Sequence, residues 1–325
     1  MTGSRAVRAA VAVALLLAAA ACGSVRAATT TRLYAYPGNP LFAAARLLQG
    51  NGHRAEAAMV RALAQVPSGI WAAGQPGEMP EIRQVTRQAA RAHAIPVIIA
   101  YNLPGRDACG KYSATGPITP SGYESWIRQL AAAIGPGDDI IIVEPDGLPD
   151  LARGCLPAAQ ARERYKLLRF AMRRLSALPR ARVYLDAGNP GLFPDPARLV
   201  QPLEQAGIRY GRGFSANVSN FQWTSAVVTW SQRLERALGA RLGAVIDTSR
   251  NGRGPYTGPD TPQWCNPPGR APGPAPRLDP GARGIDAYLW IKNPGASDGP
   301  CNGGPPAGQY WLSYAIALER ASHPS

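Results

Sequence analysis

Short apolar runs rich in valine, isoleucine and alanine alternate with longer alanine- and leucine-rich segments from residue 33 to the end of the chain. Runs without polar alternation are typical of strands that are buried on both faces, as in a parallel sheet covered by helices. Eight such units over about 290 residues predict a single (β/α) barrel with its active site at the carboxyl ends of the strands. A doubly wound open sheet is the alternative, but no Gly-x-Gly-x-x-Gly follows the first expected strand.

The alternation gives approximate bounds for each element. The expected strands are Leu33–Tyr36, Gly69–Ala73, Pro96–Tyr101, Asp139–Glu144, Arg182–Asp186, Gly213–Val218, Gly243–Asp247 and Ile285–Ile291. The expected helices are 41–49, 53–65, 80–93, 121–134, 157–178, 196–206, 224–239 and 309–322. Residues 251–284 are dense in proline and glycine, and we expect them to form a loop over the active site, with a domain linker as the alternative.

Composition excludes several classes of protein. Hydrophobic residues make up 46% of the 325 residues and charged residues 17%, which excludes intrinsic disorder. No run of 18 apolar residues lies beyond the N-terminus, so we expect no membrane span. The three histidines stand in unrelated contexts and no P-loop motif occurs, so we expect neither a Ser/His/Asp hydrolase nor a metal or other cofactor.

The net charge of +14 comes from 32 arginines and three lysines. Enrichment of arginine together with alanine, glycine and proline is interpreted first as codon bias, and the functional alternative is attraction to an acidic surface or polymer. The arginines are scattered and form no stripe, so we expect no nucleic-acid partner. We expect a monomer.

The N-terminus is typical of an exported protein. Arg5 and Arg8 precede the apolar stretch Ala9–Ala21, so we expect residues 1–28 to be a signal peptide and residues 29–325 to be one secreted domain. A lipoprotein signal with a lipid anchor at Cys22 is the alternative, although the residues before Cys22 lack the leucine usually found three places upstream. The four remaining cysteines, an even number, predict two disulfides with three possible pairings: Cys109, Cys155, Cys265 and Cys301.

Aspartates follow five of the expected strands. They are Asp107, Asp146, Asp186, Asp247 and Asp298. In a parallel barrel all these strand ends open on one face, although aspartate is also common there as a helix N-cap. Converging carboxylates without histidine suit either glycoside hydrolysis or the binding of a divalent metal ion.

Tryptophans favour the first of these chemistries. Trp71, Trp223, Trp264 and Trp290 lie at or near strand ends or in the long loop, and flat aromatic faces suit the apolar faces of pyranose rings. Trp264 lies in the Pro/Gly loop and is expected to be a sugar platform, whereas Trp290, in the middle of a strand, is expected in the core. Arg106 and Lys292 are expected to fix the charge states of nearby carboxylates.

Seven motifs in sequence order resemble glycoside hydrolase family 6, the secreted inverting cellulases. They are residues 101–107, 142–146, 184–188, 217–220, 245–252, 264–269 and 290–299, which read YNLPGRD, IVEPD, YLDAG, NVSN, VIDTSRNG, WCNPPG and WIKNPGASDG. The resemblance runs from about residue 33 to 320. It implies a distorted, TIM-like barrel of seven to eight parallel strands and the pairing Cys109–Cys155 and Cys265–Cys301.

The resemblance also implies roles for individual residues. Asp146 is similar to the proton donor, Asp107 to the residue that raises the donor's pKa and organises the water, and Asp298 to the candidate base. The remaining implied substrate-site residues are Trp71, Tyr101, Ser113, Asp186, Asn217, Trp264 and Lys292. We therefore expect inverting cleavage of a β-1,4-glucan, with an acid–base separation of roughly 6.5–9.5 Å.

Three positions depart from the family's usual pattern. Asn189 and Leu192 replace a histidine and a tryptophan after the Tyr-Leu-Asp-Ala-Gly motif, and Ala296 replaces a glutamate near Asp298. These changes remove sugar-binding groups and leave the aspartates in place. Moderate spans between the paired cysteines favour an open cleft and endo action. The alternatives are exo action that releases cellobiose and a weakly active or non-catalytic glycan-binding protein of the cell envelope.

Overall fold

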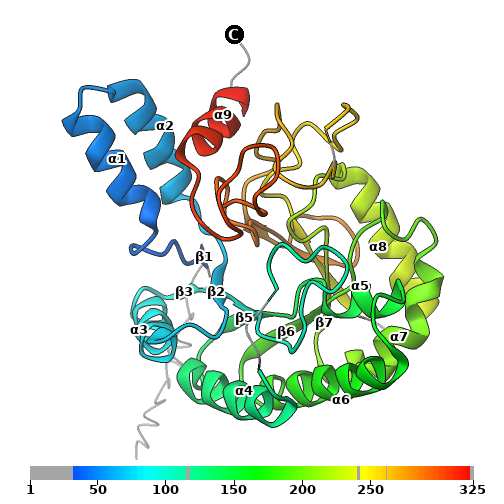
Figure 1. The fold of residues 1–325 in the computed structure, drawn as a ribbon. Helices are drawn as coiled ribbons and strands as arrows, with labels where there is room; N and C mark the ends of the chain where they lie inside the picture. Colours follow the sequence, from blue (N-terminus) through cyan, green and yellow to red (C-terminus); the bar gives the residue numbers. More distant parts are fainter. Residues whose placement is uncertain (1–31, 115–117, 240–241, 261, 323–325) are drawn as a thin grey trace, which may run out of the picture. The chain divides into compact units, whose positions relative to one another are not determined.

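The computed structural model describes residues 32–114, 118–239, 242–260 and 262–322. The expected signal peptide, with Cys22, lies outside these ranges. No helix within the described ranges is both long enough and apolar enough to cross a membrane. The residues from 32 onward form one unit built around a curled sheet (Figure 1).

The main sheet contains seven parallel strands and one antiparallel edge strand. In spatial order they are β2 (Ile70–Ala72), β4 (Val97–Ala100), β5 (Asp139–Val143), β6 (Ala181–Asp186), β7 (Gly213–Ala216), β8 (Gly243–Asp247), β10 (Ile285–Leu289) and β9 (Arg277–Leu278). The parallel order confirms the expected TIM-like barrel, with seven parallel strands.

The first expected strand, Leu33–Tyr36, does not belong to this sheet. Only Arg32–Leu33 (β1) is extended, and it pairs with β3 (Ala94–Ile95) in a separate two-stranded sheet. Pro96 separates β3 from β4, because proline has no N–H to contribute to a ladder. The eighth strand of the main sheet is instead the unexpected β9, which lies in the Pro/Gly segment.

The two ends of the parallel array meet without a regular ladder. The Gly69 N–H donates to the Trp290 carbonyl at 2.8 Å, and the Trp71 indole N–H donates to the Ile291 carbonyl at 3.0 Å. A Cβ atom on Gly69 would lie 2.2 Å from the Ile291 oxygen, so only glycine permits this approach. These two hydrogen bonds link β2 and the residue before it to the residues just after β10, and among the described residues no ladder joins the two strands.

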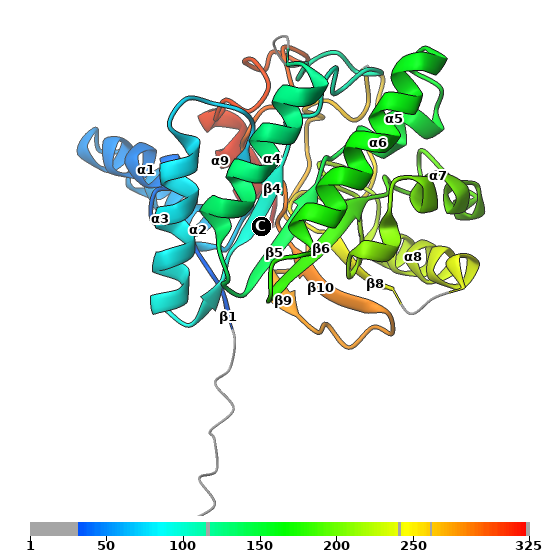
Figure 2. The ribbon, with the colours of Figure 1, turned by 90° about the horizontal axis from the view of Figure 1, so that it is seen from below.

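Helices cover the outer face of the sheet (Figure 2). They are α3 (Glu78–Arg91), α4 (Pro120–Ile134), α5 (Gly147–Ala152), α6 (Ala158–Leu175), the short 3₁₀ helix η1 (Pro196–Leu199) continued by α7 (Val200–Gln205), η2 (Ile208–Tyr210) and α8 (Thr224–Leu238). A second group, α1 (Pro40–Gly50), α2 (Arg54–Gln65) and α9 (Leu312–Ser322), packs around the buried side chain of Trp290. The long helices begin and end within three residues of the expected positions, whereas α5 was not expected.

Alternation along the strands divides the core in two. In β4 and β5, Ile98 and Ile141 pack with the outer helices, while Ile99 and Ile142 fill the barrel interior. This period of two follows from the opposite orientation of successive side chains in a strand. Both sets are buried, which explains why these strands lack polar positions in the sequence.

Candidate active site

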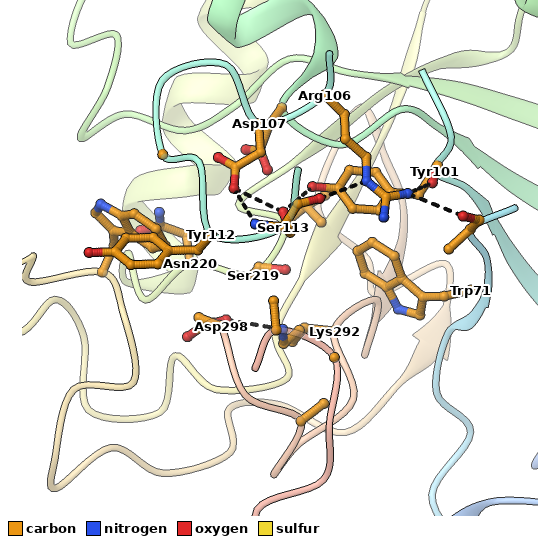
Figure 3. Close-up of a pocket in the computed structure, with 18 of the residues that line it drawn as sticks. Trp71, Tyr101, Arg106, Asp107, Tyr112, Ser113, Ser219, Asn220, Lys292 and Asp298 are labelled. Carbon is orange, nitrogen blue, oxygen red and sulfur yellow. Dashed lines mark hydrogen bonds and ion pairs between the residues drawn. The ribbon is translucent and has the colours of Figure 1, made fainter. Parts of the chain in front are cut away.

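A pocket of about 780 Å³ opens at the carboxyl ends of the parallel strands. Its walls come from β2 and from the loops that follow β4, β5, β6, β7 and β10, with one further wall from the Pro/Gly segment (Figure 3). Eight of the ten side chains expected at the site line it: Trp71, Tyr101, Asp107, Ser113, Asp146, Trp264, Lys292 and Asp298. Asp186 and Asn217 do not line it.

Asp146 stands between β5 and α5 in the left-handed region, with φ of 66°. Its surroundings favour the neutral form. Burial raises the pKa of its carboxyl well above the ordinary value, and the negative charges of Asp186, Asp150 and Asp107 raise it further, against a smaller opposing effect of Lys292. A carboxyl group held protonated in a pocket is suited to act as a general acid.

Asp186 lies directly behind Asp146. It is fully buried at the end of β6, and it accepts hydrogen bonds from the Asp146 backbone N–H at 3.0 Å and from the Ser215 hydroxyl at 3.1 Å. Burial raises its pKa to about 7, although these hydrogen bonds act in the opposite direction. In this structure Asp186 therefore supports the proton-donor candidate and does not face the pocket.

Asn217 does not line the pocket but holds the turn that follows β7. Its side chain donates to the Asp247 carbonyl at 2.9 Å and accepts from the Gln222 N–H at 3.1 Å. These bonds fix the turn after β7, whose Ser219 and Asn220 line the pocket.

Asp107, Ser113 and Tyr101 form a hydrogen-bonded chain along one wall. Asp107 Oδ2 accepts from the Ser113 N–H at 2.7 Å and from the Ser113 hydroxyl at 3.0 Å, and the Tyr101 hydroxyl lies 2.8 Å from that same Ser113 oxygen. Arg106 was expected to act on a neighbouring carboxylate. It does so at Glu144, whose pKa it lowers against the larger raising effect of burial. Its guanidinium also lies 4.3 Å from the centre of the Tyr101 ring and donates to the Ser113 carbonyl at 2.8 Å.

Asp298 faces this wall across the pocket (Figure 3). Its two oxygens accept from both Arg250 Nη atoms, at 2.8 and 3.0 Å, from Lys292 Nζ at 3.0 Å and from the Asn266 N–H at 3.0 Å. Burial alone would raise the pKa of Asp298, but Arg250 and Lys292 outweigh burial and hold it below the ordinary value. The pocket thus contains one carboxyl whose surroundings raise its pKa and one whose surroundings lower it.

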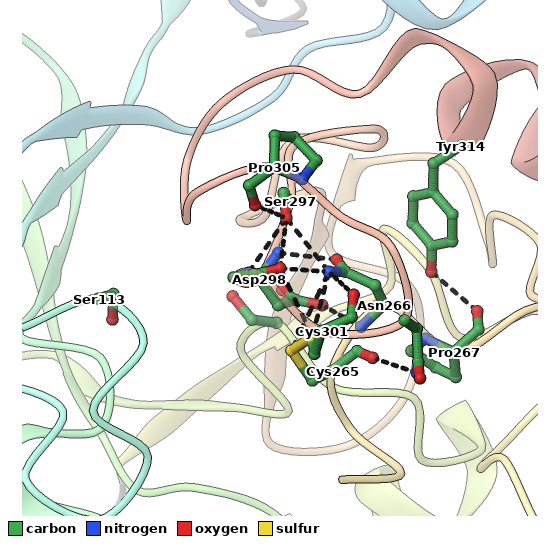
Figure 4. The surroundings of a disulfide bond; sticks show 12 residues. Ser113, Cys265, Asn266, Pro267, Ser297, Asp298, Cys301, Pro305 and Tyr314 are labelled. Atoms are coloured by element: carbon green, nitrogen blue, oxygen red, sulfur yellow. Dashed lines mark hydrogen bonds between the residues drawn. A yellow bond between two sulfur atoms is a disulfide. The ribbon is translucent and has the colours of Figure 1, made fainter. Parts of the chain in front are cut away.

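Both expected disulfide pairings are confirmed. Cys109–Cys155 joins the loop after β4 to the segment just after α5, and Cys265–Cys301 joins the Pro/Gly segment to the loop that carries Asp298. Figure 4 shows Asn266 beside the second bridge, where its side-chain oxygen accepts the Asp298 backbone N–H at 2.8 Å. The bridge therefore fixes the Trp264 loop against the ionised carboxylate.

Aromatic pairs lie at two ends of the pocket. Trp71 and Tyr101 meet edge to face at 5.1 Å, and Tyr112 meets Trp264 at 5.6 Å. Trp264 is 37% exposed, so a ring face is available to a ligand. As the sequence predicted, Trp290 is in the core, whereas Trp223 is exposed and does not line the pocket.

Three residues that line the pocket or contact Asp298 were not identified from the sequence. Arg250 stands inside the motif 245–252, and this was a usable signal, because only Arg106 and Arg250 among the 32 arginines lie within the seven motifs. Tyr112 lines the pocket next to Ser113, and Asp150 lines it one helical turn after Asp146. The Asp-x-x-x-Asp spacing was a usable signal for Asp150, because residues four apart share a helix face.

One further cluster has the side chains of a metal site. Within the described ranges, one group of three potential ligands is close enough to hold an ion: Cys109, Asp150 and Cys155. Its two sulfur atoms are bonded to each other, so they are not free thiolates.

Comparison with known proteins identifies the family. A family model described as "Glycosyl hydrolases family 6" matches residues 28–322. "Endoglucanase 1" of Streptomyces halstedii is 37% identical over 315 residues, covering 94% of this chain and 95% of that protein. "Endoglucanase 1" of Streptomyces sp. (strain KSM-9) is 38% identical over 257 residues, covering 78% of this chain and 68% of that protein.

A solved structure extends the match to the fold. The endoglucanase Cel6 from Mycobacterium tuberculosis, in complex with methyl-cellobiosyl-4-deoxy-4-thio-β-D-cellobioside, superposes with a TM-score of 0.82 at 37% identity. The match covers 90% of this chain and 98% of that one. The chain belongs to glycosyl hydrolase family 6.

Proposed function

We propose that the protein is an endo-acting β-1,4-glucan hydrolase that inverts configuration at the anomeric carbon. The observation that carries the proposal is that one pocket holds two carboxyl groups with opposite pKa shifts: burial and neighbouring carboxylates raise the pKa of Asp146, while Arg250 and Lys292 lower that of Asp298. Relatives named endoglucanases at 37–38% identity and the cellobioside-derived ligand of the Mycobacterium tuberculosis structure support the substrate.

In the proposed reaction, Asp146 donates its proton to the glycosidic oxygen as the bond to the anomeric carbon breaks. Asp107 and Ser113 hold a water on the other face of the sugar. The oxocarbenium-like transition state carries positive charge, which the ionised Asp298 stabilises. Trp71 and Trp264 provide aromatic faces for pyranose rings at the two ends of the pocket.

The sequence predicted Asp298 as the base, and its contacts make a second assignment preferable. Four donors already occupy its two oxygens, so taking a proton would cost it a hydrogen bond in a buried environment. Asp107 has one oxygen that accepts no hydrogen bond from the described residues, and it touches the pocket. We therefore propose Asp107 as the acceptor of the water proton and Asp298 as the fixed negative charge.

The first experiment follows hydrolysis of soluble β-1,4-glucans and cello-oligosaccharides by the wild-type protein. Endo action predicts that viscosity falls faster than reducing ends accumulate, and inversion predicts that proton NMR detects the α-anomer first. Early β-anomer would establish a retaining route and remove the proposed roles. Cellobiose as the sole early product would favour exo action, and binding without hydrolysis would leave a glycan-binding protein.

Asp146→Asn removes the proton donor. Turnover on cello-oligosaccharides should fall by about 10²–10⁴-fold or more, with substrate binding retained. Because the reactive form of Asp146 is protonated and its pKa is raised, wild-type activity should persist below this raised pKa and decline as the pH rises through it. Rates measured against pH should lose this basic limb in the variant, and a variant with wild-type turnover would remove Asp146 from the role.

Asp107→Asn and Asp298→Asn distinguish the two candidate bases. Both should lower turnover, but azide needs no deprotonation, so it should restore cleavage only where the base has been lost. We expect azide to rescue Asp107→Asn, with an α-glycosyl azide as product detected by mass spectrometry and NMR. Rescue of Asp298→Asn alone would return the base role to Asp298.

We also propose that residues 1–28 direct export and that residues 29–325 are the exported catalytic domain. The charged and apolar parts of the N-terminus and the two disulfides, which persist in oxidising compartments, support this. Amino-terminal sequencing of the exported protein should give a start near residue 28 or 29. A lipidated start at Cys22 would indicate an anchored form, and an uncleaved chain in the cell would contradict export.

A further inference from the structure

Asp150 connects the two segments that carry the proposed acid and base. It lies one turn after Asp146 in α5, where its N–H donates to the Asp146 carbonyl at 2.9 Å. Its Oδ2 accepts the N–H of Ala108, the residue after Asp107, at 2.6 Å. Its side chain is buried yet borders the pocket, so it lies between the proton donor and the loop of the base.

The same residue also braces the neighbouring disulfide. The Asp150 carbonyl accepts the Cys155 N–H at 3.0 Å, while its carboxylate holds Ala108, which precedes Cys109. The Cys109–Cys155 bridge and Asp150 therefore join the same two segments at adjacent points. A covalent bond and a charge-assisted hydrogen bond together leave the Asp107 loop little freedom to move relative to α5.

Arg164 completes the arrangement from α6. It is 3% exposed, and its Nη1 lies 3.9 Å from Asp150 Oδ2. Its Nη2 donates to the carbonyls of Pro104, at 3.2 Å, and Gly105, which belong to the loop that leads to Asp107. A buried guanidinium needs such partners, so Arg164 and Asp150 hold this loop from two directions.

We propose that Asp150 is a positioning residue of the reaction, which ties the Asp107 loop to the helix of Asp146 and places a second negative charge one helical turn from the proton donor. The inference rests on the proposed function, because it assigns Asp150 a part in the work of Asp146. Asp150 would affect catalysis only through Asp146 and Asp107.

The charge of Asp150 acts among several groups. Those that act on Asp146 or Asp150 are Tyr101 and Asp107 from the loop after β4, Arg164 from α6, Asp186 from β6 and Lys292 from the loop after β10, and Arg153 at the end of α5 lines the same pocket. Arg164 favours the ionised form of Asp150, while burial opposes it more strongly and raises its pKa. After burial and Asp186, Asp150 is the next largest contribution to the raised pKa of Asp146, ahead of Asp107.

Two substitutions separate the charge from the hydrogen bond. Asp150→Asn keeps an oxygen that can accept the Ala108 N–H but removes the charge. In this variant one negative charge near Asp146 is gone, so the pKa of Asp146 should fall. The basic limb in the profile of kcat/KM against pH, which reports loss of the Asp146 proton, should therefore move to lower pH by on the order of one unit. Asp150→Glu keeps the charge but lengthens the side chain, so its basic limb should stay in place while kcat falls several-fold.

Glu163→Gln is the matched control, since Glu163 is a carboxylate on α6 that pairs with exposed Lys166 and does not line the pocket. It should leave both kcat and the pH profile unchanged. Thermal unfolding and near-ultraviolet circular dichroism of each variant verify its fold.

Each outcome decides between specific alternatives. An Asp150→Asn variant that folds and keeps the wild-type basic limb would overturn the electrostatic part of the inference. If that variant does not fold, Asp150→Ser, which also removes the charge, takes its place in the pH profile. Wild-type kcat in Asp150→Glu would overturn the positioning part. A wild-type protein without activity on any β-1,4-glucan would instead overturn the proposed function, which keeps the two failures distinguishable.

Discussion

Repulsion among carboxylates at one rim of the barrel is the constraint on which the site depends. Parallel strands end at a common edge, so their acidic residues converge in a low-dielectric environment where like charges cannot all remain ionised. The cations are distributed unequally: Arg250 and Lys292 contact Asp298, and Arg164 approaches Asp150. Asp146 has no cation within ion-pair distance among the described residues, and the smaller effect of Lys292 does not offset the rise in its pKa that burial and the neighbouring carboxylates cause.

Local backbone strain accompanies this electrostatic arrangement. Asp107, Glu144 and Asp146 have φ of 54°, 49° and 66°, values that L-residues adopt at a cost of about 1–3 kcal/mol each. Buried contacts offset this cost, since the Glu144 carboxylate accepts the N–H groups of Asn102 and Leu103 at 3.0–3.1 Å. The strained residues are thus held by the strands and loops beside them, and the disulfides extend the same restraint to the pocket walls.

The sequence predicted what depends on local pattern. Gly243–Asp247 forms a strand over its whole expected length, because its apolar run is continuous and its ends are marked. By contrast, the sequence wrongly placed β1 in the main sheet and did not predict β9. Each of these strands has only two residues, and so short a strand carries almost no periodic signal. The position of Asp186 behind Asp146 depends on how neighbouring strands twist, and the pairing of Arg250 with Asp298 spans 48 residues. Neither contact follows from local spacing.

The departures from the family pattern acquire a physical meaning in the structure. Asn189 is buried, and its side-chain oxygen accepts the N–H groups of Gly191 and Leu192 at 2.9 and 3.1 Å. These hydrogen bonds stabilise the turn in which Asn189 lies. Leu192 is 37% exposed and lines the pocket, where it offers an apolar surface. A sugar hydroxyl buried against leucine without a partner costs about 1–3 kcal/mol. At this position the chain can therefore hold a ligand by apolar contact but not by a side-chain hydrogen bond, in contrast to the polar wall that Asp107 and Ser113 form.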